Sequence, residues 1–171
     1  YSRGLEAYAL TNPLASQTMP ADAVGASPVG VEKPYAYLAK WNSIVDVSFL
    51  GYLLQNKVKV RFSEVAFTVE GNSYNAGTLV ITRRGNEKLG EKFDAIVRKA
   101  TQKFDRKVTG VATGFVTKGK DFGSSAVRYL KAPKIAVLSG DGVSSLGFGE
   151  VWHFFEQQIQ YPITVLDTDY F

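Results

Sequence analysis

The stretch that decides the expected fold spans residues 134–171 and reads KIAVLSGDGVSSLGFGEVWHFFEQQIQYPITVLDTDYF. Residues 135–138 form a short apolar run that ends in a glycine-rich loop, which is typical of a strand buried on both faces. Within residues 148–159 apolar side chains recur every three or four positions, which predicts an amphipathic helix. Pro162 ends this helix, and residues 163–166 give a second, β-branched strand. The stretch therefore predicts a β-α-β unit with parallel strands.

Upstream patterns predict further elements of the same kinds. Apolar periodicity predicts helices at 44–56 and 89–104, and strands at 35–41, 57–62, 65–69, 78–82 and 108–112. Residues 70–73, Glu-Gly-Asn-Ser, carry the chemistry of a tight hairpin turn. Because strands alternate with helices, the expected fold class is α/β: three layers around a mostly parallel sheet, with a β-hairpin appended.

The chain divides into an arm and one domain. Residues 1–34 show little periodicity and are rich in proline, glycine and small residues, so we expect a linker or wrapping arm. Residues 35–171 are expected to form a single α/β domain, since 171 residues suffice for one sizeable core. The chain starts with Tyr rather than Met and has no leader pattern, which predicts an excised piece. A sheet of this class normally continues after such a strand, so we expect the domain to be incomplete at its C-terminus.

Composition excludes several classes of protein. With 45% hydrophobic residues the chain should be globular, and no apolar run approaches the ~18 residues of a membrane span. The absence of cysteine excludes disulfides, thiolate metal sites and a cysteine nucleophile. The net charge of +4 is modest, although residues 83–107 contain nine Lys or Arg. Acids are interspersed among them, which indicates a solvated helix face rather than a nucleic-acid surface.

Two polar clusters are candidate ligand-binding sites, because ligands of α/β sheets sit at the carboxyl ends of strands. One is the loop between the first strand and the helix, and the other follows the last strand. The candidate residues are Ser139, Gly140, Asp141, Gly142, Ser144, Ser145, Asp167 and Asp169. The loop suits a small anion or an interdomain contact. It lacks the lysine of a P-loop, however, and Asp141 would repel an anion, which favours a structural turn. The aspartates could bind a hard cation or be a solvated strand end.

Catalytic constellations are missing from the sequence. His153 is the chain's one histidine, whereas a zinc hydrolase with nitrogen ligands needs at least two. Glu150 and His153 make half of a carboxylate-bridged dimetal motif, without its partner half. A Ser-His-Asp triad would depend on the same histidine, and no G-x-S-x-G elbow is present. We therefore predict neither catalytic residues nor metal ligands here, and interpret His153 as a structural or solvated side chain.

Two motifs carry a resemblance to a known family. They are G-D-G-V-S-S-x-x-F-G-E-x-W at 140–152 and Y-P-x-T-x-x-x-T-x-Y-F at 161–171. Together with GLEAYAL at 4–10 and FTVEGNSYNAGTLVITR at 67–83, they resemble the region that follows the catalytic domain in large secreted zinc carboxypeptidases of Bacteroidetes-type bacteria. The resemblance covers nearly the whole chain. In that family the region looks like a class I glutamine amidotransferase-like domain, which is flavodoxin-like.

The resemblance implies an accessory role. The family's zinc ligands, a His-x-x-Glu pair and a later His, match nothing in this chain, and the amidotransferase nucleophile is a cysteine, which is absent. We therefore expect a non-catalytic accessory domain, secreted, periplasmic or at the cell surface. It would pack in cis on the catalytic domain of its parent peptidase, which would hold the zinc, or assist binding of peptide or cell-wall substrate. The alternative is a free-standing α/β domain that binds a small anion or metal at residues 140–147. No oligomeric state is predicted.

Overall fold

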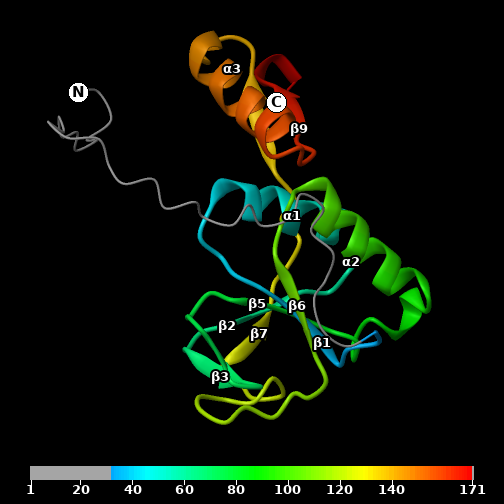
Figure 1. Cartoon of the computed structure of the whole chain (residues 1–171). Coiled ribbons are helices and arrows are strands. Elements are labelled where there is room, and N and C mark those ends of the chain that lie inside the picture. Colours follow the sequence, from blue (N-terminus) through cyan, green and yellow to red (C-terminus); the bar gives the residue numbers. More distant parts are fainter. Residues whose placement is uncertain (1–31, 171) are drawn as a thin grey trace, which may run out of the picture.

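The computed structural model describes residues 32–170 (Figure 1). The expected linker at 1–34 lies almost wholly outside the described residues. Helical segments are α1 (Ile44–Gln55), η1 (Glu87–Leu89), α2 (Lys92–Lys103), α3 (Ser145–His153), η2 (Phe154–Gln158) and η3 (Thr168–Tyr170). Strands are β1 (Ala36–Ala39), β2 (Arg61–Ser63), β3 (Phe67–Val69), β4 (Asn72–Tyr74), β5 (Leu79–Thr82), β6 (Val108–Val111), β7 (Val127–Tyr129), β8 (Ala136–Ser139) and β9 (Thr164–Asp167). The mixed α/β class is confirmed.

The main sheet corrects the expectation of a mostly parallel arrangement. Its five strands have the order β6-β1-β5-β2-β7, and all their pairings are antiparallel. Helix α1 joins β1 to the parallel strand β2, and α2 joins β5 to the parallel strand β6, but another strand lies between the members of each pair. This split β-α-β arrangement is that of ferredoxin-like folds. The strand-helix-strand pattern in the sequence is the same whether the two parallel strands are adjacent or separated, so it did not reveal the inserted strand.

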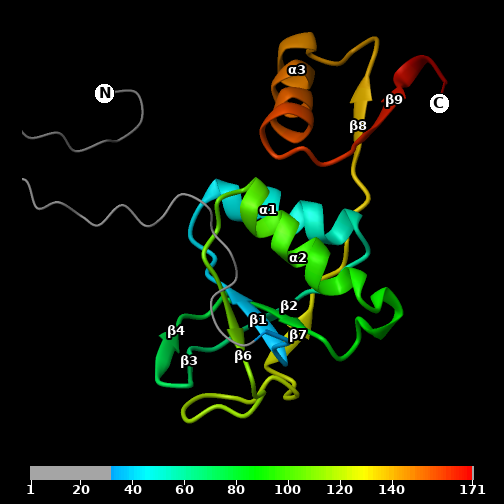
Figure 2. The ribbon, with the colours of Figure 1, turned by 45° about the vertical axis from the view of Figure 1, so that its right-hand side comes forward.

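The two faces of the main sheet bury different sets of side chains. Tyr37 and Ala39 of β1 belong to a core cluster with α1 and α2, whereas Ala36 and Leu38 belong to a second cluster with β3 and β4. Side chains alternate between faces along a strand, so a strand covered on both sides is apolar throughout. This explains why all four residues of β1 are buried. The helices lie on one face of the sheet and the β3–β4 hairpin on the other (Figures 1 and 2).

The hairpin forms at the predicted turn but with a different return strand. Strand β3 pairs with β4 through Glu70 and Gly71, both of which have positive φ, +48° and +77°. The expected partner strand at 78–82 instead enters the main sheet as β5, between β1 and β2. The short turn therefore closes a separate two-stranded ribbon that covers the face of the main sheet.

The β-α-β unit predicted from residues 134–171 is present. Strands β8 and β9 pair in parallel, with Ser139 opposite Asp167, and α3 connects them. They form their own two-stranded sheet and do not join the main one. Figure 2 shows this unit beyond α1 and α2, on the side away from the main sheet. Helix α3 ends in the π-helical turn η2 before the chain returns to β9.

The segment before β9 attaches this unit to the helices. Ile159 and Tyr161 are buried, 4% and 9% exposed. The Gln55 side-chain amide donates to the Gln160 carbonyl oxygen at 2.9 Å, and the Lys103 ammonium donates to the Gln160 side chain at 2.8 Å. The unit is therefore held on α1 and α2 by both apolar and polar contacts. Within residues 32–170, no helix has the length and apolar character needed to cross a membrane.

Candidate functional site

The structure brings the two predicted polar clusters together. Strands β8 and β9 run in parallel, so their carboxyl ends meet at one edge. The Thr168 hydroxyl donates a 3.0 Å hydrogen bond to the carbonyl oxygen of Asp141, which joins the glycine loop to the end of β9. Residues 139–142 and 167–169 therefore lie side by side at one end of the small sheet.

Close packing requires glycine at the start of this loop. Gly140 has φ +101°, in the region that favours glycine, and a Cβ there would lie 2.5 Å from Asp167 Oδ1 and 2.6 Å from Thr168 Oγ1. Gly142 also has positive φ, +77°, but a Cβ there would meet no atom within 4 Å. The first glycine thus permits contact between the strand ends, and the second only shapes the turn.

Several of the predicted site residues hydrogen-bond within the loop itself. Ser144 is the N-cap of α3, and its hydroxyl oxygen accepts a 3.2 Å hydrogen bond from the Gly147 amide. The Asp141 carboxylate accepts from the Gly142 amide, and the Asp167 carboxylate from the Asp169 amide. These bonds give the polar residues a local structural role, because they satisfy the turn and the helix start.

Ser145 lies apart from the strand-end cluster. It lines a hollow of about 500 Å³ on α3, together with Glu150 and His153. Over residues 32–170, no group of three or more His, Cys, Asp or Glu side chains is placed to hold a metal ion. The hollow therefore offers one carboxylate and one imidazole, which falls short of the three protein ligands of a typical catalytic zinc site.

A network of ionisable groups stabilises the junction of β1, β5 and α2. The Asp94 carboxylate accepts a 2.8 Å hydrogen bond from the Tyr37 hydroxyl and two bonds, of 2.7 and 3.0 Å, from the Arg83 guanidinium. Burial raises the pKa of Tyr37, and its hydrogen bond to Asp94 raises that pKa further. Burial also raises the pKa of Asp94, but the bonds from Arg83 and Tyr37 outweigh it, so this pKa lies below its ordinary value. The network links β1, α2 and the residue that follows β5, and it stabilises the fold.

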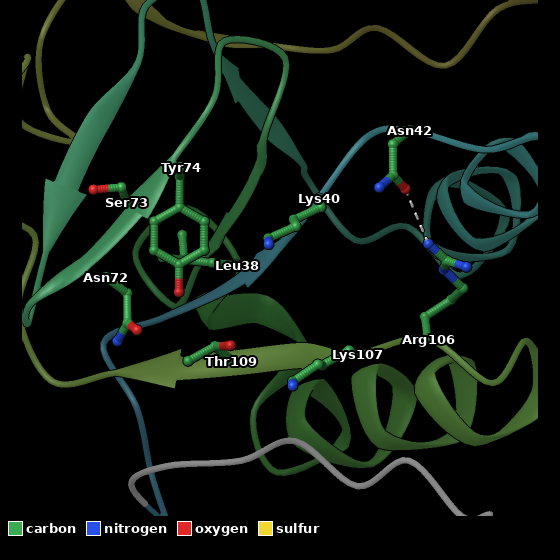
Figure 3. A pocket seen from close by; sticks show the side chains of 9 residues that line it. All are labelled: Leu38, Lys40, Asn42, Asn72, Ser73, Tyr74, Arg106, Lys107 and Thr109. Carbon is green, nitrogen blue, oxygen red and sulfur yellow. Dashed lines mark hydrogen bonds between the residues drawn. The ribbon is translucent and has the colours of Figure 1, made fainter. Parts of the chain in front are cut away.

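A basic pocket lies on the face of β1 that is turned away from α1 and α2, between the main sheet and the β3–β4 hairpin (Figure 3). Its volume is about 470 Å³, within the range of small-molecule sites. Three cationic side chains line it, Lys40, Arg106 and Lys107, and none of its lining residues is acidic. The other lining residues are Leu38 and the hydrogen-bonding side chains Asn42, Asn72, Ser73, Tyr74 and Thr109. This composition suits an anion.

The pocket was not predicted from the sequence, because its residues come from three separate segments, 38–42, 72–74 and 106–109. Lys40 follows β1 and Lys107 precedes β6, and the two become neighbours only because those strands pair in antiparallel register. The sequence does show a lysine at the end of each of these two strands. That the two lysines are neighbours can be concluded only once the pairing of β1 with β6 is known. Comparisons with protein-family models, curated proteins and solved structures give no match to this chain.

Proposed function

We propose that this chain is a non-catalytic accessory part of a secreted bacterial zinc carboxypeptidase, and that it packs in cis on other parts of that protein. In this proposal β8, α3 and β9 begin a flavodoxin-like, class I glutamine amidotransferase-like domain. Support comes from the family resemblance of residues 140–152 and 161–171. The parent catalytic domain would hold the zinc and bind the peptide, outside the cell or in the periplasm.

The observation that carries the packing proposal is the exposed apolar surface of the β8–α3–β9 unit. Leu138 is 50% exposed and Val165 45%. These two side chains occupy alternate positions of the parallel register, so they point to opposite faces of the small sheet. Helix α3 adds exposed Leu146, Val151 and Trp152. A parallel sheet is normally covered on both faces, so we expect another part of the protein to pack against this apolar surface.

Energetics favour such packing. Burying a large apolar side chain fully is worth about 1.5–3 kcal/mol, so covering a half-exposed one is worth roughly half of that. A two-stranded sheet is at best marginally stable by itself. Additional strands beside β8 or β9 and a helix across the uncovered face would therefore stabilise the unit.

The chemistry of the sequence supports a non-catalytic role. The chain has no cysteine, so it cannot supply the nucleophile of a glutamine amidotransferase, and its single histidine cannot supply the usual ligand set of a zinc peptidase. We therefore propose no reaction for this chain. Its contribution would be to hold the catalytic domain or to help position peptide or cell-wall substrate.

The test compares this chain with the longer protein that the proposal assigns it to. We expect the longer protein to contain stoichiometric zinc and to release C-terminal residues from peptides, and this chain alone to do neither. In the longer protein, the double variant Leu138→Lys, Val165→Lys should lower the midpoint of thermal unfolding, because it places charge in a buried interface. Phe115→Lys is the matched control, since Phe115 is 79% exposed and lies outside the unit.

Two results would overturn the proposal. One is zinc-dependent peptidase activity of this chain alone, which would assign catalysis to residues 1–171. The other is equal thermal stability of the double variant, the Phe115→Lys control and the unchanged longer protein, which would mean that the apolar surface of the unit stays uncovered.

A second candidate function is binding of a small anion at the 140–147 loop by a free-standing domain. The observation that favours it is the meeting of this loop with the end of β9, held by the bond from Thr168 to Asp141. Titration with inorganic phosphate, followed by amide chemical shifts, should then perturb Gly142 and Val143. Gly142→Val should abolish these shifts while the fold persists. Shifts elsewhere, or none, would reject this candidate.

A further inference from the structure

In the basic pocket, two lysines stand at opposite positions of two paired strands. Strands β1 and β6 pair with Leu38 opposite Thr109 and Ala39 opposite Val108, so the next positions outward are Lys40 and Lys107. Both lysines line the pocket, and Figure 3 shows both ammonium groups extending into it. Like charges directly opposite each other on paired strands are destabilising. An anion between them would remove this repulsion.

Nearby carboxylates do not neutralise these lysines. Arg106, the third cation, pairs with Asp46 at 2.7 Å. The Asp46 carboxylate also accepts hydrogen bonds from the amides of Asn42 and Ser43, at 2.9 and 2.7 Å, and its side chain is only 2% exposed. Asp46 therefore balances Arg106. Within residues 32–170, Lys40 and Lys107 form no ion pair, so the pocket keeps their two positive charges.

Neutral hydrogen-bonding groups surround the charged end of the pocket. The side chains of Asn72, Tyr74 and Thr109 line it beside the lysines (Figure 3). Tyr74 lines the pocket, and its hydroxyl forms no hydrogen bond with another described residue. The Tyr74 ring is fixed by stacking on Phe67, with ring centroids 5.2 Å apart. The hydroxyl is therefore held in place as a donor for a ligand.

We propose that this pocket binds the carboxylate or phosphate group of a small polar molecule. Lys40 and Lys107 supply the charge, and Tyr74, Thr109 and Asn72 supply hydrogen bonds to the oxyanion or to adjoining polar groups. The volume of about 470 Å³ leaves room for more of the molecule than its anionic group. This site is separate from the 140–147 loop and does not depend on the accessory role proposed above.

The test is an NMR titration of the whole chain with sodium phosphate and, in parallel, sodium acetate, with sodium chloride at equal ionic strength as reference. We expect saturable shifts of the Lys40, Asn72 and Thr109 amides with at least one oxyanion, and the stronger of the two identifies phosphate or carboxylate as the preferred group. Because each lysine supplies a charge-assisted hydrogen bond, Lys40→Gln with Lys107→Gln should weaken binding about tenfold or more. Lys88→Gln with Lys99→Gln, two exposed lysines outside the pocket, is the control.

A second readout uses the repulsion between the lysines. In low-salt buffer without oxyanion, Lys107→Gln should raise the midpoint of thermal unfolding, whereas Lys88→Gln should not. The stronger oxyanion should raise the midpoint of the unchanged protein and of Lys88→Gln more than that of Lys107→Gln. The proposal is overturned if neither oxyanion gives saturable shifts at the pocket, or if the shifts map to residues 140–147 instead. It is also overturned if Lys107→Gln and Lys88→Gln have the same thermal midpoints with and without oxyanion.

Discussion

The ring of Tyr161 lies directly against Gly51 of α1: a Cβ at Gly51 would be 3.1 Å from Tyr161 Cδ2. On its other side, the Tyr161 hydroxyl donates a 2.8 Å hydrogen bond to the carbonyl oxygen of Pro133. One aromatic side chain thus contacts both the helix and the segment that enters β8. The absence of a side chain at Gly51 is what allows the ring to approach the helix.

Replacing Tyr161 should therefore separate the β8–α3–β9 unit from α1. Tyr161→Ala removes a buried aromatic ring, and we expect it to lower the free energy of unfolding by about 3 kcal/mol. Tyr161→Phe removes only the bond to Pro133 and should cost about 1 kcal/mol. Urea denaturation gives both values, and limited proteolysis should cut residues 154–162 faster in the alanine variant. Equal stability of the two variants would show that the ring does not secure the unit.

Asp94 should make the protein sensitive to acid. Its pKa is below the ordinary value in the folded state, so its stabilising effect is complete above the unfolded pKa of about 4 and is lost as pH falls through the lower folded pKa. Asp94→Asn should lower the free energy of unfolding at neutral pH by about 1 kcal/mol, since the pair with Arg83 is partly exposed.

The pH series identifies the cause of this change. From about pH 5 to pH 3 the stability of Asp94→Asn should fall less steeply than that of the unchanged protein. Glu156→Gln, at an exposed carboxylate, should follow the unchanged protein throughout. Parallel pH curves for Asp94→Asn and the unchanged protein would contradict the assignment.

The two glycines of the 139–147 loop should differ in their tolerance of alanine. Gly140→Ala introduces both a strained backbone and a clash with Asp167 and Thr168, and should cost about 2 kcal/mol or more. Gly142→Ala meets no neighbouring atom and should cost about 1 kcal/mol from its positive φ alone. Trp152 fluorescence in a Trp41→Phe background reports unfolding of this unit specifically. A smaller effect at Gly140 than at Gly142 would refute the close contact of the strand ends.

Asn86 should be a strong determinant of stability although it lies in a turn. It is 3% exposed; its side-chain oxygen accepts from the Lys59 amide at 2.7 Å, and its amide donates to the carbonyl oxygens of Lys59 and Thr82, both at 2.9 Å. Asn86→Ala leaves buried backbone groups unpaired and should cost about 2–3 kcal/mol in urea denaturation. Asn75→Ala, at an exposed asparagine, should change stability by less than about 0.5 kcal/mol. Similar values for both would contradict this role.

Much of the local structure was readable from the sequence. The strands predicted at 135–138 and 163–166 are found at 136–139 and 164–167, and the helix predicted within 148–159 begins three residues earlier, after Ser144. The turn at Glu70 and Gly71 follows from its composition in the same way. Each of these features depends on residues close together in the chain. Asn86 shows the limit of such reasoning, because its side chain bonds to the backbone of Lys59, 27 residues away.

Strand order and the basic pocket were decided by the tertiary structure alone. Periodicity records which side of a segment faces the core, and this is the same for β5 whether it pairs with the hairpin or inserts between β1 and β2. The insertion makes the main sheet antiparallel, and the β1–β6 pairing places Lys40 opposite Lys107. The sequence by itself determined the positions of the main helices, of most strands and of the β8–α3–β9 unit, because these follow from patterns of neighbouring residues; β4 and β7 were not predicted. Only long-range strand pairing determined which charges meet, because it joins segments that are far apart in the chain.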